Sequence, residues 1–191
     1  DTVASISGAT AYQYDQMKEA ALSAGSATSF TATEAASALE YMSLAGWDVN
    51  TSTTALMPVL RMAAATGAEL GTTSDLVTDS MSALGLGVDD LESYMDKMIA
   101  ANNNANATAE MLMTSMVKTG GASKTLGASL DDTIIALGIL ANNGVKAEEA
   151  GTALNAILTR IATKSTALDE FKNIGVSIFD SNGSFIGLKE T

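Results

Sequence analysis

The chain has 191 residues, ten basic and twenty-two acidic side chains, a formal net charge of −12, and neither cysteine nor histidine. This composition excludes disulfides, thiolate chemistry and the two commonest transition-metal ligands. The negative charge disfavours nucleic acid and anionic membrane surfaces as partners, and no stretch is long and apolar enough to span a bilayer. We therefore expect no cofactor, no metal site, no nucleic-acid binding and no membrane span in this segment.

Apolar residues recur with helical spacing along most of the chain, which predicts a mainly α fold. Thr31 with Glu34 has the pattern of a capping box at a helix start. Glycines at the ends of apolar runs predict helix stops, with Gly46 and Gly144 at positive φ. The expected helices cover residues 9–24, 32–45, 50–66, 72–84, 88–102, 108–119, 130–142, 146–163 and 166–174, and the expected stops are Gly46, Gly67, Gly85, Asn143 with Gly144, and Gly175.

The third expected helix contains the only proline of the chain, Pro58. Proline lacks the backbone N–H and its ring clashes with the preceding turn, so we expect a kink at Pro58 or a split after Met57.

The end of the chain has a different pattern. Two short runs of β-forming residues, Val176–Phe179 and Ser184–Gly187, flank a segment that contains Asn182 and Gly183. An Asn-Gly pair between such runs favours a β-hairpin, here over residues 175–188. A hairpin alone is marginal in water, so its apolar residues should pack on a helix or on a further strand.

One helical hairpin recurs at a shift of 98 residues without a gap. ALEYMSLAGWDVNTSTTALMPVL from Ala38 aligns with ALGILANNGVKAEEAGTALNAIL from Ala136, and the turn glycines Gly46 and Gly144 coincide. This predicts a compact multi-helix bundle over residues 1–174 with a duplicated hairpin at about 33–64 and 131–162. A weaker third copy would turn at Gly85. The chain lacks an initiator methionine, and we interpret it as a fragment of a longer protein.

Few residue patterns point to chemistry. Ser115 and Lys118 have the spacing of an acylating serine and its lysine, but the companion motifs of those hydrolases are absent. The acidic pairs of the chain fall at helix N-termini, where they complement the helix dipole. Trp47, directly after the turn glycine, is interpreted as an apolar anchor of the hairpin. The sequence thus indicates a structural or assembly component, not an enzyme.

From Ala38 onward the sequence resembles the core region of the phage tail tape measure proteins of long-tailed phages and prophages, especially those of Gram-positive bacteria. The most specific stretches are LAGWD at Leu44–Asp48 and LANNGVKAEEAGTAL at Leu140–Leu154. The likeness runs in order over about residues 20–190, while the first 20 residues match no motif.

The resemblance implies a protein in the lumen of the virion tail, and in the host cytoplasm during assembly. Its members govern tail length and tail tube assembly and can aid DNA delivery; their partners are the tail tube protein, tail assembly chaperones and the baseplate hub. The oligomeric state, including a homo-oligomer, stays open. An alternative is a helical protein-interaction domain of a non-phage surface or secreted protein.

Overall fold

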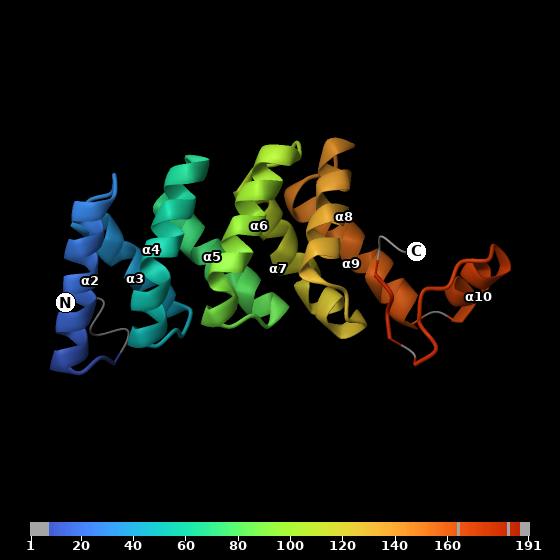
Figure 1. Ribbon diagram of the computed structural model, residues 1–191, viewed down its shortest axis with the longest axis horizontal. Helices are drawn as coiled ribbons and strands as arrows, with labels where there is room; N and C mark the ends of the chain where they lie inside the picture. The colour runs from blue at the N-terminus through green and yellow to red at the C-terminus, as the bar shows by residue number, and fades with distance from the viewer. Residues whose placement is uncertain (1–7, 164, 183, 188–191) are drawn as a thin grey trace. The chain divides into compact units, whose positions relative to one another are not determined.

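The computed structural model describes residues 8–163, 165–182 and 184–187 (Figure 1). Within these ranges the fold is mainly α, as predicted. The elements are α2 (Ala11–Ala27), α3 (Ala32–Leu44), α4 (Val49–Thr66), α5 (Leu70–Leu84), the 3₁₀ turn η1 (Val88–Asp90), α6 (Leu91–Asn104), α7 (Ala109–Leu126), α8 (Leu130–Asn142), α9 (Ala147–Thr163) and α10 (Ser165–Asn173).

The chain divides into two compact units. The first comprises Asp1–Ser82 and Leu86–Ile99, and the second comprises Ala83–Gly85 and Ala100–Thr191. The first unit therefore contains α2 to α4, nearly all of α5, and most of α6, while the second contains α7 to α10.

The helices of the first unit begin at side-chain caps. The Thr10 hydroxyl accepts a hydrogen bond from the Gln13 amide N–H, and the Thr31 hydroxyl accepts one from the Glu34 amide N–H. The Glu34 carboxylate in turn accepts a hydrogen bond from the Thr31 amide N–H at 2.7 Å. Two donors of the first turn are thereby satisfied at each start. The capping box expected at Thr31 is confirmed.

Methionine and small residues fill the core of the first unit. Among the fully buried side chains are Met42, Met62, Met81 and Met98, beside the wholly buried Ala35, Ala38 and Ala55. Because alanine lets helix axes approach closely and methionine adapts to irregular gaps, this combination packs a core with few aromatic rings.

One aromatic group does lie in that core. Tyr94 of α6 is completely buried, and its hydroxyl donates to Ser80 Oγ of α5 at 2.6 Å, while Ser80 Oγ donates to the Leu76 carbonyl at 2.6 Å. Burial raises the pKa of the Tyr94 phenol well above its usual range, since ionisation would place a charge in an apolar interior.

Pro58 does not split its helix. α4 is continuous from Val49 to Thr66, and Pro58 lies inside it, half-buried. The predicted split after Met57 is therefore wrong, while the alternative of a kink at Pro58 stays a prediction. The neighbours Leu56, Val59 and Leu60 are all buried, so tertiary packing holds the turn that the proline weakens.

Two helices are longer than predicted, and each continues through a glycine that directly follows its predicted end. α7 continues past Gly120 to Leu126, and α2 continues past Gly25 to Ala27. A Cβ on Gly120 would lie 2.9 Å from the Ala83 carbonyl carbon, and one on Gly25 would lie 2.5 Å from the Ala32 amide nitrogen. These glycines allow close packing, and they do not end their helices.

The predicted C-terminal β-hairpin is wrong: the described residues contain no β-strand. Phe179 and Phe185 form a single antiparallel bridge, with their rings in an edge-on contact at 6.2 Å. The Asp180 carboxylate accepts the amide N–H groups of Asn182 and Ser184, both at 2.8 Å. The side-chain turn thus takes the Ser184 N–H, which a hairpin ladder would need, and an isolated pair of strands has little stability to oppose it.

Candidate interaction site

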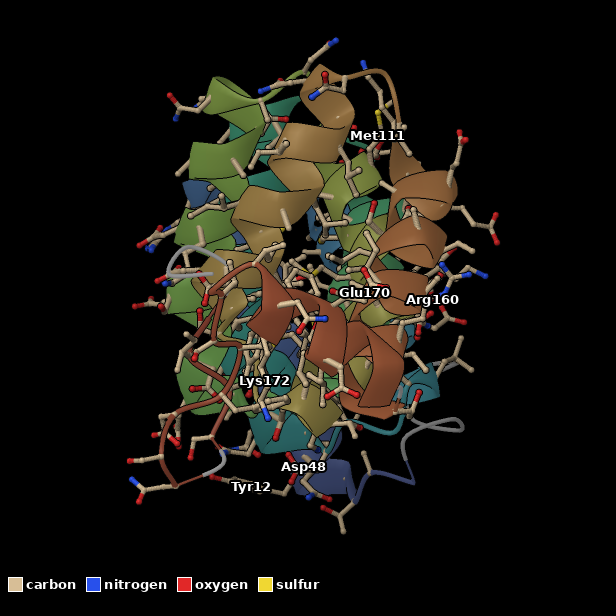
Figure 2. All side chains as sticks on the ribbon, turned by 90° about the vertical axis from the view of Figure 1, so that its right-hand side faces the viewer. Tyr12, Asp48, Met111, Arg160, Glu170 and Lys172 are labelled. Carbon is tan, nitrogen blue, oxygen red and sulfur yellow. The ribbon has the colours of Figure 1, made fainter. Side chains whose placement is uncertain are left out.

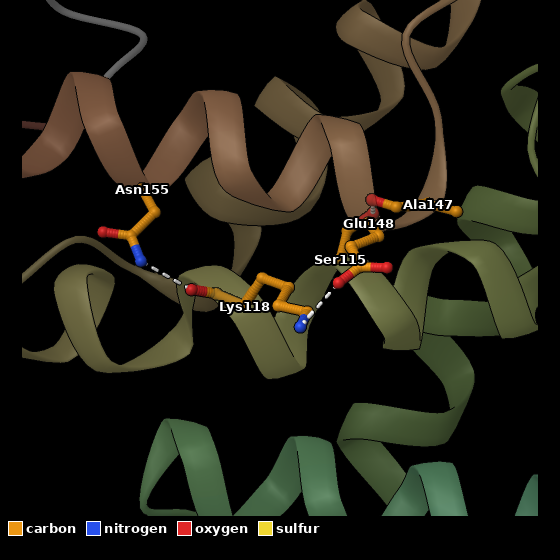
Figure 3. Close-up of polar contacts among 5 residues, drawn as sticks. All are labelled: Ser115, Lys118, Ala147, Glu148 and Asn155. Atoms are coloured by element: carbon orange, nitrogen blue, oxygen red, sulfur yellow. Dashed lines mark hydrogen bonds and ion pairs between the residues drawn. The ribbon is translucent and has the colours of Figure 1, made fainter.

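The pair Ser115 and Lys118 lies on α7 and is occupied by structural contacts (Figure 3). Ser115 is buried, and its hydroxyl lies 2.6 Å from the Ala147 carbonyl oxygen and 2.9 Å from that of Met111. Lys118 Nζ pairs with Glu148 Oε1 at 2.7 Å, and this partner lowers the pKa of the Glu148 carboxyl. The serine is hidden and the lysine is paired with a carboxylate, so the two residues join helices and are not arranged for acyl transfer.

The same contact continues along the helix pair α7 and α9. Asn155 Nδ2 donates to the Lys118 carbonyl at 2.7 Å. Between these polar contacts lies Gly151, where a Cβ would meet the Ser115 backbone and would lie 2.8 Å from Lys118 Cβ. Ala147, Gly151 and Asn155 follow one another at four-residue intervals, so one edge of α9 rests directly on the backbone of α7.

The acidic residues act at helix starts. Asp48 accepts the Thr51 amide at 2.7 Å and Glu69 accepts the Thr72 amide at 2.6 Å, and these hydrogen bonds lower the pKa of both carboxyls. The described residues hold no cluster of acidic side chains that could bind a metal ion, and no helix among them is long and apolar enough to cross a membrane.

The turn glycines close two equivalent hairpins. Gly46 and Gly144 have φ of 85° and 91°, so the predicted positive φ is confirmed. After each of them the chain makes the same backbone hydrogen bond, from Trp47 to the Met42 carbonyl at 3.0 Å and from Val145 to the Leu140 carbonyl at 2.9 Å. These are the long bonds of a Schellman motif.

The remaining predicted positions lie in or near turns. Trp47 is half-buried, and Asn143 caps α8 and donates to the Ile139 carbonyl. Gly85 follows α5 with φ of 72°. Asn182 lies in the Asp180 turn, and Gly183 lies outside the described residues. The structure does not bring these residues together into one site.

An apolar groove of about 350 Å³ lies between α8 and α9. Ile135, Ile139 and Ile157 line it and are 40%, 58% and 47% exposed. The half-buried Leu140 and Ala136 form its floor, and Asp132 lies at one end. Large aliphatic side chains gathered in this way mark a contact surface.

The sequence analysis did not single out this groove, because helical spacing shows which residues are apolar but not which of them another element covers. The available signal was the composition of α8, which carries apolar residues on more than one face: Ile134 and Leu137 are buried, and Ile135 and Ile139 point elsewhere. A helix that is apolar on several sides needs more than one neighbour.

Comparisons with known proteins relate the chain to structural proteins of phage tails. The phage-related minor tail protein family matches residues 18–191. The chain is 34% identical to the tape measure protein of Pneumococcus phage Dp-1 over 189 residues, which are 98% of this chain and 16% of that protein. It is 27% identical to the probable tape measure protein of Escherichia phage P2 over 169 residues, which are 88% of this chain and 21% of that protein. No solved structure matches.

Helical hairpins joined by glycine turns and an exposed apolar groove define a helical assembly module. With the family match over nearly the whole chain, this chain belongs to the phage-related minor tail proteins, and its role is structural, in the phage tail. The matches give no support to a non-phage surface or secreted protein.

Proposed function

We propose that the chain is a segment of a longer tape measure protein that governs tail length and tail tube assembly. The observation that carries this proposal is the 34% identity to the tape measure protein of phage Dp-1 over 98% of the chain. The chain spans about a sixth of that relative and about a fifth of the phage P2 relative, so length control would reside in the whole protein.

The proposed partners are the tail tube protein, tail assembly chaperones and the baseplate hub, and the proposed site is the tail lumen after assembly in the host cytoplasm. A role in DNA delivery at infection belongs to the same proposal. The acidic character of the chain supports a protein contact over a contact with DNA, because a net charge of −12 repels phosphates.

Within such a protein this segment would supply two compact helical units, not the ruler. A ruler gains about 1.5 Å per residue only where one helix continues. Here the helices have 9 to 18 residues and turn back at glycines such as Gly46 and Gly144.

The test of the function is tail length. Shortening or lengthening the parent gene outside the coding region of residues 1–191 should change tail length in proportion, measured by electron microscopy of negatively stained particles. Tails of unchanged length would refute the ruler role of the parent protein.

A further inference from the structure

The two halves of the chain can be compared position by position. The helices α7, α8 and α9 begin 98 residues after α2, α3 and α4, at Ala109, Leu130 and Ala147 against Ala11, Ala32 and Val49. Each position in the second set therefore has a counterpart in the first.

Burial differs sharply on one face of these sets. In the first set five positions on α3 and α4 are wholly buried, whereas their counterparts on α8 and α9 are half-buried or exposed. The buried residues are Ala38, Met42, Ala55, Val59 and Met62, and the respective counterparts are Ala136, Leu140, Ala153, Ile157 and Arg160. The counterparts Ala136, Leu140 and Ile157 line the groove described above.

In the first unit, α5 and α6 lie along this face. Tyr41 of α3 contacts the start of α5: a Cβ on Gly71 would lie 3.0 Å from Tyr41 Cε2. Met62 and Pro58 of α4 line a shared groove with Met95 of α6. The start of α5 therefore lies against α3, and α6 lies beside α4, in the unit where the five positions are wholly buried.

The described part of the second unit has no such cover. Residues 184–187 reach Asp132, where a Cβ on Gly187 would lie 2.9 Å from Asp132 Oδ2, and α10 contacts α9. Ile139 nevertheless remains 58% exposed and Ile157 47% exposed. These side chains present to solvent the same kind of surface that the first unit buries.

We infer that the groove of α8 and α9 is covered by an amphipathic helical hairpin like α5 and α6, supplied by the part of the parent protein outside residues 1–191. The inference rests on the proposed function in one respect, that the chain is a segment of a longer protein. The cover would present a stripe of aliphatic, methionine and small residues to Ile139 and Ile157. Arg160 of α9 stands at the position of Met62, which lines a groove with Met95 of α6 (Figure 2 shows Arg160). Opposite Arg160 the cover would therefore carry an acidic or polar group in place of a methionine.

The absence of cysteine from the chain makes a direct test available. Ile157→Cys is introduced into the 191-residue chain and into a parent protein whose other cysteines are removed, and the rate of maleimide labelling is measured under native conditions. The control is Thr152→Cys on the same helix. Both Thr152 and its counterpart Thr54 are exposed, so the cover should leave position 152 open.

The expected result is rapid labelling at position 157 in the 191-residue chain and labelling at least about tenfold slower in the parent protein, with position 152 equally fast in both. Equal rates at position 157 would overturn the inference. The inference would also be overturned if labelling at position 157 of the 191-residue chain became slower as the protein concentration rose. A second copy of the chain would then cover the groove. Tail length does not enter this readout, so the inference and the ruler role can fail separately.

Discussion

The hydroxyl of Ser115 on α7 lies 2.6 Å from the carbonyl oxygen of Ala147 at the start of α9. Ala147 has φ of 49°, the one positive value among the described non-glycine residues. A backbone conformation that costs an alanine about 1 kcal/mol or more is thus held by a partly buried hydrogen bond from a neighbouring helix. The contact places the next turn of α9, with Gly151, directly on α7.

Gly151→Ala is expected to destabilise the chain by about 1 to 3 kcal/mol, because the added methyl group would collide with the Ser115 backbone. Gly121→Ala is the matched control in α7. Nothing lies within 4 Å of a Cβ at Gly121, so alanine there should be neutral or stabilising by up to about 1 kcal/mol. Urea denaturation followed by circular dichroism compares the two variants. A Gly151→Ala variant as stable as wild type would show that the α7–α9 contact is looser than described.

Gly144→Val should cost on the order of 1 kcal/mol or more, because a β-branched residue is strained at φ of 91°. Gly144→Asn should recover much of that loss, since asparagine tolerates the left-handed region. No atom lies within 4 Å of a Cβ at this position, so backbone conformation alone separates the variants. Thermal melts of the three proteins provide the measurement, and equal midpoints would contradict the turn assignment.

Local signals were sufficient to predict where most helices begin and end. α8 matches its predicted range of 130–142, and α3 and α9 differ from theirs by one residue, because Ser, Thr and Gly at helix ends act on adjacent backbone groups. Long-range contacts account for the errors. The predicted range of α7 ended before Gly120, whereas the helix continues past the close contact of Gly120 with Ala83 to Leu126, where Gly127 ends it with φ of 80°.

The candidate site was harder to predict for the same reason. The alignment at a shift of 98 residues pairs Val59 with Ile157, which are similar residues, yet Val59 is wholly buried and Ile157 is half exposed. The difference arises from the segment after each hairpin: α5 and α6 follow α4 in the first unit, whereas the shorter α10 follows α9 and leaves Ile157 exposed. A periodic pattern gives the side of a helix that is apolar but does not give its partner.

Ser80→Ala and Tyr94→Phe should cost different amounts of stability although they remove the same hydrogen bond. Tyr94→Phe leaves Ser80 bonded to the Leu76 carbonyl and should cost about 1 kcal/mol or less. Ser80→Ala leaves the buried Tyr94 hydroxyl without its partner and should cost about 1 to 3 kcal/mol. Chemical denaturation at neutral pH measures both, and the reverse order would contradict the direction of the bond.

The same tyrosine should make stability depend on alkaline pH. The pKa of Tyr94 is raised in the folded state above the ordinary value of 10.0, so its contribution is complete below that value and is lost as pH rises above it. Tyr94→Phe should therefore lose less stability than wild type between pH 9 and pH 11. Parallel denaturation series over this range provide the measurement, and identical slopes would refute the burial of the phenol.

The Asp48 carboxylate should make the stability of the protein depend on acidic pH. The Thr51 amide lowers the pKa of the Asp48 carboxyl below its ordinary value of 3.8, so the stabilisation is present above that value and is lost as pH falls through the lowered pKa. Asp48→Asn keeps an acceptor for Thr51 and should resemble wild type at neutral pH, but it should lose less stability on acidification. Asp48→Ala should be weaker than both at neutral pH. An unchanged acid profile for Asp48→Asn would contradict the assignment.

Tail length after matched deletions tests the central claim most directly. Removing about 100 helical residues of the parent protein outside residues 1–191 should shorten the tails by about 150 Å, at about 1.5 Å per residue of helix. Removing a similar number from within the two compact units should not give tails shortened by the same amount, because these helices fold back on themselves at their glycine turns. Tails of wild-type length after the outer deletion, measured by electron microscopy, would contradict the proposal that the parent protein is a tape measure.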